Sequence, residues 1–323
     1  MEIRKFNTTN ENEWNNFLYL ANNSTLFDTL NFLNYHSFEK FNLLNLMIYE
    51  DHELLALLPA AIFVENGRKI LKSPYGASVG GPIFKAGLSF EVKNNIISEI
   101  ISYSKINNIN SINFKLAPTL YYKQPNDDLS FSLFSLGFKL NNRWLTLINT
   151  LPDTFEQLIE KIPIRKRRYF NQALKNKLEF EIGNIDNLTE FYSILLQNRA
   201  KFNSIPTHNL KDLEYLFNQC SPRIKIFFTK SNNKKLAAGL VFELTDNMAY
   251  VFYLCHLDEG EIFRCSFFCS MKIQEYYILN NFKYIDFGPS TFNDMSINYG
   301  GIKFKEELGC KGYNRDEWIY DLI

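Results

Sequence analysis

The sequence predicts an α/β protein made of two similar domains, residues 1–150 and 151–323. Three features point to this. The chain has 323 residues, a length comfortable for two domains. Helices, an antiparallel pair of long strands, a further helix and a strand occur in the same order in each half. Near residue 148 a strand ends in Asn149-Thr-Leu-Pro-Asp153, whose turn chemistry marks the boundary.

Hydrophobic patterning places the elements of the first half. It predicts strands at Ile3–Phe6, Leu44–Tyr49, Leu54–Val64, Ser111–Leu116 and Trp144–Ile148. It predicts helices at Glu13–Ala21, Leu30–Phe41 and Phe90–Ile106. The loop Ser73–Pro82 is rich in glycine, so a ligand can approach its backbone closely; alternatively, it only connects two strands.

The second half repeats the order around another hairpin. Its predicted strands are Leu178–Ile182, Leu236–Leu244, Met248–His256, Tyr284–Phe287 and Glu317–Ile323. Its predicted helices are Thr154–Lys161, Arg165–Lys175, Leu188–Phe202, Leu210–Gln219 and Ile262–Leu279. Each predicted domain is therefore a mixed, mostly antiparallel sheet flanked by helices.

Composition excludes several classes of protein. A hydrophobic content of 46% supports full cores and argues against disorder. The 35 basic and 35 acidic residues balance, so no overall field attracts nucleic acid or a membrane. The first residues lack the apolar region of a signal peptide, and the longest apolar run, Leu54–Val64, is too short to span a bilayer. We expect a soluble, cytoplasmic protein without a membrane span.

The cysteines indicate reduced thiols. They number five and show no Cys-x-x-Cys spacing, which fits neither a disulfide framework nor a zinc site. Cys265 and Cys269 lie four residues apart on an apolar helix, where a buried stripe is expected rather than a pair of metal ligands. No metal is predicted.

The stretch with the clearest chemistry is Tyr284–Ser290, followed by Gly300–Lys305 and Gly309. It predicts a buried strand that stops at a Gly-Pro pair, a polar loop, and two glycines that lead into a helix with lysines. Such a layout brings a carboxylate, backbone amides and a cation near one point at the end of a sheet. These are the parts that stabilise negative charge on a carbonyl oxygen.

The order of elements resembles the GNAT acyltransferase fold. Two copies in one chain resemble the FemAB-type group, which builds peptidoglycan cross-bridges, and its acyltransferase relatives. The matching segments are the basic helix Arg165–Lys175, the hairpin Ala237–Phe242 with Tyr250–Tyr253, the signature Asp286–Ser290 with Lys303–Lys305 and Gly309, and the loop Ser73–Gly76 with Gly80–Pro82. The resemblance covers essentially the whole chain.

The resemblance implies transfer of an acyl group, foremost acetyl, from an activated donor to a primary amine. We expect acyl-CoA as co-substrate, no permanently bound cofactor, and an acceptor such as a nucleotide-linked amino sugar of cell-envelope or polysaccharide synthesis. Two alternatives stay open: aminoacyl transfer from tRNA to a peptidoglycan precursor, and a binding module without catalysis. The long charged helical hairpin of some cross-bridge enzymes is missing, and only one glycine occurs in His256–Ser266.

Lys305 and Asp286 are the first catalytic candidates. A fixed ammonium at Lys305 can stabilise the tetrahedral oxyanion of amide formation; alternatively, it is an exposed lysine beside Glu306 and Glu307. Asp286 lies in an apolar strand, so it either meets the acceptor amine or bonds the backbone amides of the turn from Gly288. Lys305 at an exposed position is expected to matter little for stability.

His256 and Tyr253 are competing candidates for the base, because neighbouring strand positions cannot all reach one pocket. His256 can equally be an ordinary surface residue. Predicted contacts to donor or acceptor come from basic, aromatic and glycine residues: Arg165, Arg168, Arg264, Ser73, Tyr75, Gly76, Gly300, Gly301, Lys303 and Phe304. The basic run Arg165–Lys177 either grips phosphates or is a solvated helix face.

Overall fold

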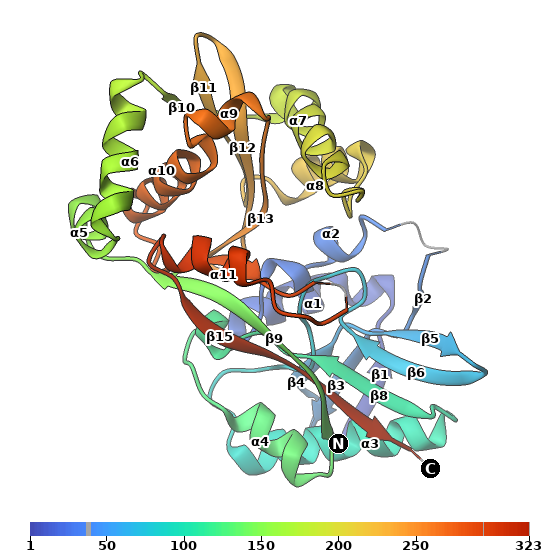
Figure 1. Ribbon diagram of the computed structural model, residues 1–323. Coiled ribbons are helices and arrows are strands. Elements are labelled where there is room, and N and C mark those ends of the chain that lie inside the picture. Colours follow the sequence, from blue (N-terminus) through green and yellow to red (C-terminus); the bar gives the residue numbers. More distant parts are fainter. Residues whose placement is uncertain (37–39, 293, 323) are drawn as a thin grey trace. The chain divides into compact units, whose positions relative to one another are not determined.

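The computed structural model describes residues 1–36, 40–292 and 294–322, which form two compact units (Figure 1). The first unit comprises Met1–Trp144 and Asn314–Ile323, and the second comprises Leu145–Tyr313. Strands β9 (Lys139–Thr150) and β15 (Lys311–Asp321) contribute residues to both units. The segment from Asn314 onward, which the division at residue 150 assigns to the second half, thus groups with the first unit.

The first unit contains two sets of paired strands. Antiparallel pairs join β1 (Glu2–Lys5), β3 (Leu46–Glu50), β4 (Glu53–Leu58) and β7 (Ile83–Phe84). The other set is β2 (Asn42–Leu43), β5 (Ala61–Glu65), β6 (Arg68–Ser73), β8 (Ser111–Lys115) and the end of β15, in which β6 and β8 run parallel. Its helices are α1 (Glu11–Leu20), α2 (Leu30–Leu33), α3 (Phe90–Ile106) and α4 (Asp128–Ser135), with short 3₁₀ turns η1 (Thr8–Asn10), η2 (Leu26–Asp28) and η3 (Thr119–Tyr121).

The second unit has a sheet of order β10 (Glu179–Gly183), β11 (Ile224–Ser231), β12 (Lys234–Glu243), β13 (Met248–His256), β14 (Tyr284–Pro289) and β9. All pairs are antiparallel except β13 and β14. Its helices are α5 (Phe155–Lys161), α6 (Ile164–Lys175), α7 (Leu188–Ala200), α8 (Leu210–Cys220), α9 (Glu259–Ile262), α10 (Cys265–Leu279) and α11 (Tyr299–Glu306), with η4 (Ile185–Asn187). Helix α10 covers one face of the sheet, and α7 and α8 cover the other (Figure 1).

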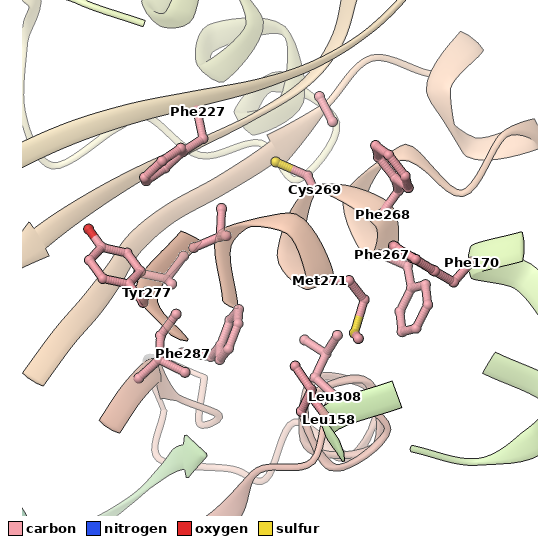
Figure 2. Packing of buried hydrophobic residues seen from close by; sticks show 14 of the residues in the cluster. Leu158, Phe170, Phe227, Phe267, Phe268, Cys269, Met271, Tyr277, Phe287 and Leu308 are labelled. Atoms are coloured by element: carbon pink, nitrogen blue, oxygen red, sulfur yellow. The ribbon is translucent and has the colours of Figure 1, made fainter. Parts of the chain in front are cut away.

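The core of the second unit forms around α10. This helix is apolar on nearly all sides, as expected for a buried helix. Leu158 of α5, Phe170 of α6 and Phe287 of β14 pack with it in one cluster (Figure 2). The rings of Phe170 and Phe268 stack with centroids 5.4 Å apart. The elements that carry the candidate site are therefore fixed to a solid core.

Several predicted elements are confirmed and others need correction. Phe90–Ile106 and Met248–His256 have the predicted bounds. The predicted strand Leu54–Val64 is wrong as one element, because the chain breaks at Pro59 and the resulting β4 and β5 join different sheets. The predicted helix Leu30–Phe41 ends at Leu33, and its residues 37–39 lie outside the described part. No helix among the described residues has both the length and the apolar character needed to cross a bilayer.

Candidate functional site

The end of β14 separates from its parallel neighbour. β13 and β14 pair through Met248, Ala249 and Tyr250, and no further pairing between them occurs among the described residues, although β13 continues to His256. On its other side β14 has a register shift against β9 between Asp286 and Pro289. The strand therefore turns away from β13 after Asp286, and on that side no described strand pairs with the later backbone of β13.

Asp286 fixes this turn. Its side chain is 0% exposed, and Oδ1 accepts hydrogen bonds of 2.6 Å from Thr146 Oγ1 and 2.6 Å from the Gly288 amide. A buried carboxylate needs such donors, because desolvation is costly without them. The geometry matches the structural alternative considered for Asp286, since the carboxylate lies within the protein and bonds the backbone of the turn.

Lys305 of α11 joins this turn from the next helix. Its ammonium donates to the Gly288 carbonyl at 2.9 Å, the Pro289 carbonyl at 3.0 Å and Ser290 Oγ at 2.9 Å. A lysine ammonium has three N–H donors, and these three oxygens match them. The expectation of an exposed Lys305 is wrong: the side chain is half-buried, because its ammonium lies against the three oxygens at the end of β14.

Asp286 and Lys305 lie close enough to each other for the charges of both to affect the thiol of Cys310. Burial raises the pKa of Cys310, the charge of Asp286 raises it further, and the charge of Lys305 lowers it. The predicted meeting of a carboxylate and a cation at the end of the sheet is thus present. The backbone amide of Gly301 is already used, since it donates to Asn298 Oδ1 at 2.8 Å in the N-cap of α11.

The end of α11 is held by an ion-pair cluster with α6. Glu307 accepts from Arg165 Nη2 and pairs with Lys166 Nζ, each at 2.8 Å. Burial alone raises the pKa of Glu307, but the hydrogen bonds and charges of Lys166 and Arg165 outweigh this and lower it. The basic helix therefore serves, at least through these two cations, to fasten the helix that carries Lys305.

Buried amides hold the same helix end from the other side. Asn149 Nδ2 donates to Gln274 Oε1 at 2.7 Å and to the Leu308 carbonyl at 3.2 Å, and Gln274 Nε2 donates to that carbonyl at 3.4 Å. Both side chains are buried. A satisfied buried network of this kind restricts the position of the backbone that leads out of α11.

Three basic side chains lie around the ring of Tyr169. The guanidinium carbons of Arg165 and Arg264 lie 5.9 and 5.3 Å from the centroid of the Tyr169 ring, and Lys166 Nζ lies 5.3 Å from it. Arg168 is exposed and forms no ion pair within the described residues. Among the described residues, neither Arg168 nor Arg264 has a carboxylate partner, whereas Arg165 pairs with Glu307.

Tyr253 belongs to a buried polar pair. It is 2% exposed, and its hydroxyl accepts from the His208 amide at 3.1 Å and lies 3.1 Å from His208 Nδ1. Burial raises the pKa of Tyr253. Sequence reasoning missed His208, because it stands alone in a loop and only the fold brings it to β13. His256 is more accessible, with Nε2 3.3 Å from Glu261 Oε1.

The glycine-rich loop of the first unit is internally bonded. Ser73 Oγ donates to the Pro59 carbonyl at 2.6 Å and accepts from the Gly81 amide at 2.8 Å. Tyr75 is buried, and its hydroxyl accepts from Asn45 Nδ2 at 3.1 Å. Ser73 and Tyr75 thus shape the loop, while their contact with a ligand stays a prediction.

The other predicted residues are placed as follows. The carbonyl of Gly76 accepts from Tyr35 Oη at 3.0 Å. Lys303 and Gly300 are exposed on α11, and Phe304 packs against the core of the second unit. Cys265 and Cys269 are buried, and burial raises their pKa values to about 11 and about 12.

Comparison with known proteins gives the fold. No family model and no curated protein matches the sequence. The structure of FemX matches with a TM-score of 0.74 at 13% identity, covering 100% of this chain and 98% of that one. A conserved protein of unknown function from Bacteroides thetaiotaomicron matches with a TM-score of 0.65 at 10% identity, covering 100% of both chains. A tandem GNAT protein from the clavulanic acid biosynthesis pathway matches with a TM-score of 0.58 at 8% identity, covering 99% and 98%.

These likenesses confirm the predicted fold. The chain has a FemX-like, tandem GNAT fold along its full length, with helices around mostly antiparallel sheets. At such low identities the likeness concerns the fold alone, and the chemistry has to be argued from the side chains.

Proposed function

We propose that this protein is an N-acyltransferase, which transfers an acyl group, foremost acetyl, from an activated donor to a primary amine. The observation that carries the proposal is the Lys305 ammonium, held by three oxygens at the end of β14 where β13 and β14 separate. The acceptor class that we propose is an amino sugar, free or nucleotide-linked, of cell-envelope or polysaccharide synthesis. In this role the protein acts in the cytoplasm.

Lys305 supplies fixed positive charge to the reaction. Attack of an amine on an acyl carbon produces a tetrahedral intermediate whose oxygen carries negative charge. Collapse of this intermediate breaks the bond between the acyl carbon and the donor, which leaves as the free thiol of coenzyme A after taking up the proton lost by the amine. The charged oxygen of the intermediate can replace one of the neutral acceptors of Lys305, and the exchange is favourable because a charged acceptor binds an ammonium more strongly than a carbonyl does. Ser290 accepts from Lys305, so its own hydroxyl proton is directed to another acceptor.

The attacking amine must first lose a proton, because an ammonium has no lone pair. We assign this step to His256 rather than to Tyr253. His256 lies at the accessible end of β13 beside Glu261, whereas the Tyr253 hydroxyl is buried and its pKa is raised. Asp286, which is 0% exposed, acts on the geometry of the turn and not on the amine.

The open side of β13 supports acyl-CoA as the donor. After Tyr250 the strand has no β14 partner among the described residues, so its backbone can pair with an extended chain that carries amide groups. The arm of coenzyme A is such a chain. It binds as a co-substrate that leaves after each turnover.

A specific feature favours a second donor. The segment between β13 and α10 carries Asp258, Glu259 and Glu261 instead of a run of glycines, so it lacks the glycine-rich backbone that lets a pyrophosphate approach main-chain amides. Together with the fold of FemX over the whole chain, this supports aminoacyl-tRNA as the alternative donor, with a peptidoglycan precursor as acceptor. A binding module without catalysis is the third possibility.

One assay separates these possibilities. Purified protein is incubated with labelled acetyl-CoA and nucleotide amino sugars, and in parallel with labelled aminoacyl-tRNA and peptidoglycan precursors, with and without ribonuclease. We expect N-acylated product from acetyl-CoA that ribonuclease does not affect. Product only from charged tRNA assigns the second donor. Absence of product from either, with ligand binding retained, contradicts catalysis.

A further inference from the structure

The first unit contains a small cavity that the proposed reaction does not use. It lies among η2, the glycine-rich loop and the segment after β8, and its lining includes Asn23, Thr25, Asp28, Gly80, Gly81 and Tyr122. Its volume of about 10 Å³ is enough for one group the size of a water molecule. A ligand can thus place only a small head group there.

One oxygen of Asp28 lacks a partner at this cavity. The side chain is 5% exposed, and Oδ2 accepts from the Thr25 amide at 2.7 Å and from Thr25 Oγ1 at 2.9 Å. Within the described residues Oδ1 accepts no hydrogen bond, and Asp28 forms no ion pair. A buried carboxylate in this state has half of its acceptor capacity unused.

The other polar wall of the cavity is already satisfied. Asn23 donates to the Pro82 carbonyl at 2.8 Å and accepts from the Phe84 amide at 2.9 Å. The loop approaches closely because both positions are glycine: a Cβ at Gly80 would lie 2.8 Å from the Pro74 nitrogen, and Gly81 has a φ of 108°. The backbone of Gly80 and Gly81 thus forms part of the wall, and Asp28 is the acidic group among the described lining residues.

No basic side chain in the part of the chain that the structure describes compensates Asp28. The charge of Asp28 contributes to raising the pKa of Tyr75 and of Tyr122, and the charge of Asp127 also raises the pKa of Tyr122. Burial raises the pKa of Tyr75 to about 12 and raises that of Tyr122 as well, so both phenols are neutral near pH 7. Burial also raises the pKa of Asp28 to about 7, which means that the site carries either a proton or an uncompensated charge.

We propose that this cavity binds a primary ammonium group, with Asp28 Oδ1 as its counter-ion. An ammonium has the size of water, donates hydrogen bonds in several directions and supplies the missing charge. A neutral hydroxyl leaves the charge uncompensated, and a trimethylated head group is too large. Because a paired ammonium is not a nucleophile, the contact serves recognition, and it is independent of the acyl transfer proposed for the second unit.

Calorimetry at pH 8 with n-butylammonium chloride tests the proposal. The comparison ligands are 1-butanol, which lacks the charge, and butyltrimethylammonium, which exceeds the cavity. The comparison variants are Asp28→Asn and the matched control Asp51→Asn, an exposed aspartate of the same unit. We expect wild type and Asp51→Asn to bind n-butylammonium, and Asp28→Asn to bind it about tenfold or more weakly.

Carbon NMR of the Asp28 carboxyl in the wild-type protein covers the case in which Asp28→Asn does not fold. Bound ammonium must lower the pKa of Asp28, because it favours the charged form. Equal binding by a folded Asp28→Asn variant, equal binding of butanol, absence of binding, or an unchanged Asp28 titration each overturns the proposal. None of these outcomes touches acyl transfer, which is measured by product formation.

Discussion

Asp28 in the first unit and Asp286 in the second are both aspartates with almost no exposed surface, yet their surroundings differ. Asp286 Oδ1 receives one hydrogen bond from a side chain and one from the backbone of the turn to which Lys305 is bonded. Asp28 receives both of its bonds from Thr25 on Oδ2, and it lines a cavity. Burial alone therefore does not tell the role of a carboxylate; the partners of each oxygen do.

The largest effect that we expect concerns Asp28 and pH. Its pKa is about 7 in the folded protein against an ordinary value of 3.8, so between these values the folded state holds a proton that the unfolded state has lost. The free energy of unfolding should fall as the pH rises from about 4 to about 7 and stay level above that. The full contribution is about 4 kcal/mol. Urea unfolding at a series of pH values measures it.

Asp28→Asn is the control for this pH dependence, because other groups also titrate in this window. Burial raises the pKa of Glu243, for example, and that contribution remains in the variant. The difference between wild type and Asp28→Asn isolates Asp28 and should grow toward high pH in favour of the variant. Parallel curves over the whole range would show that Asp28 is ionised at ordinary pH in the folded protein.

Asp286→Ala should cost about 3 kcal/mol of stability, because Thr146 and the Gly288 amide lose a charged acceptor inside the protein. Asp286→Asn keeps an oxygen acceptor in the same place, so its loss should be smaller, about 1 kcal/mol. Chemical denaturation of both variants at pH 7 gives the two values. If Asp286→Ala and Asp286→Asn lower the free energy of unfolding by the same amount, the hydrogen bonds to Oδ1 do not hold the turn.

The smallest effects concern Arg165 and Arg168, which repeat the contrast between a partnered and an unpartnered charge. Arg168→Gln should raise the Michaelis constant of a phosphate-bearing substrate a few-fold and weaken its salt dependence, without changing stability. Arg165→Gln also breaks the ion pair with Glu307. Because the Arg165 side chain is 60% exposed, this should lower stability by at most about 1 kcal/mol. Steady-state kinetics of the two variants are measured at low and at high salt. If neither variant differs from wild type at either salt concentration, α6 is a structural helix that does not bind phosphate.

Sequence reasoning succeeded where a local pattern is strong. The helix Phe90–Ile106 and the strand Met248–His256 carry periodic apolar residues between clear turns, and both have the predicted bounds. The segment from Asp286 to Lys305 was also predicted, because a Gly-Pro stop, a polar loop and paired glycines are local signals. Together with the resemblance, these signals sufficed for the fold.

What sequence reasoning missed depends on contacts between distant residues. Asp28 follows Thr25 as a local cap, and only the approach of Gly80 and Gly81 makes it the wall of a cavity. His208 meets Tyr253 across 45 positions of the chain. The half-buried state of Lys305 arises likewise from acceptors on another element, which no spacing within α11 reveals.

The most direct test of the central claim is turnover and unfolding of Lys305→Ala, measured on the same sample beside Lys311→Ala, an exposed lysine of the same unit. Loss of three hydrogen bonds at the end of β14 should lower stability by about 1–3 kcal/mol. Turnover of the folded variant should fall about 10²-fold or more, and by more than the Michaelis constant rises, because the charge that Lys305 meets exists chiefly in the transition state. Near-full turnover by folded Lys305→Ala would contradict the account and leave Lys305 as a structural brace.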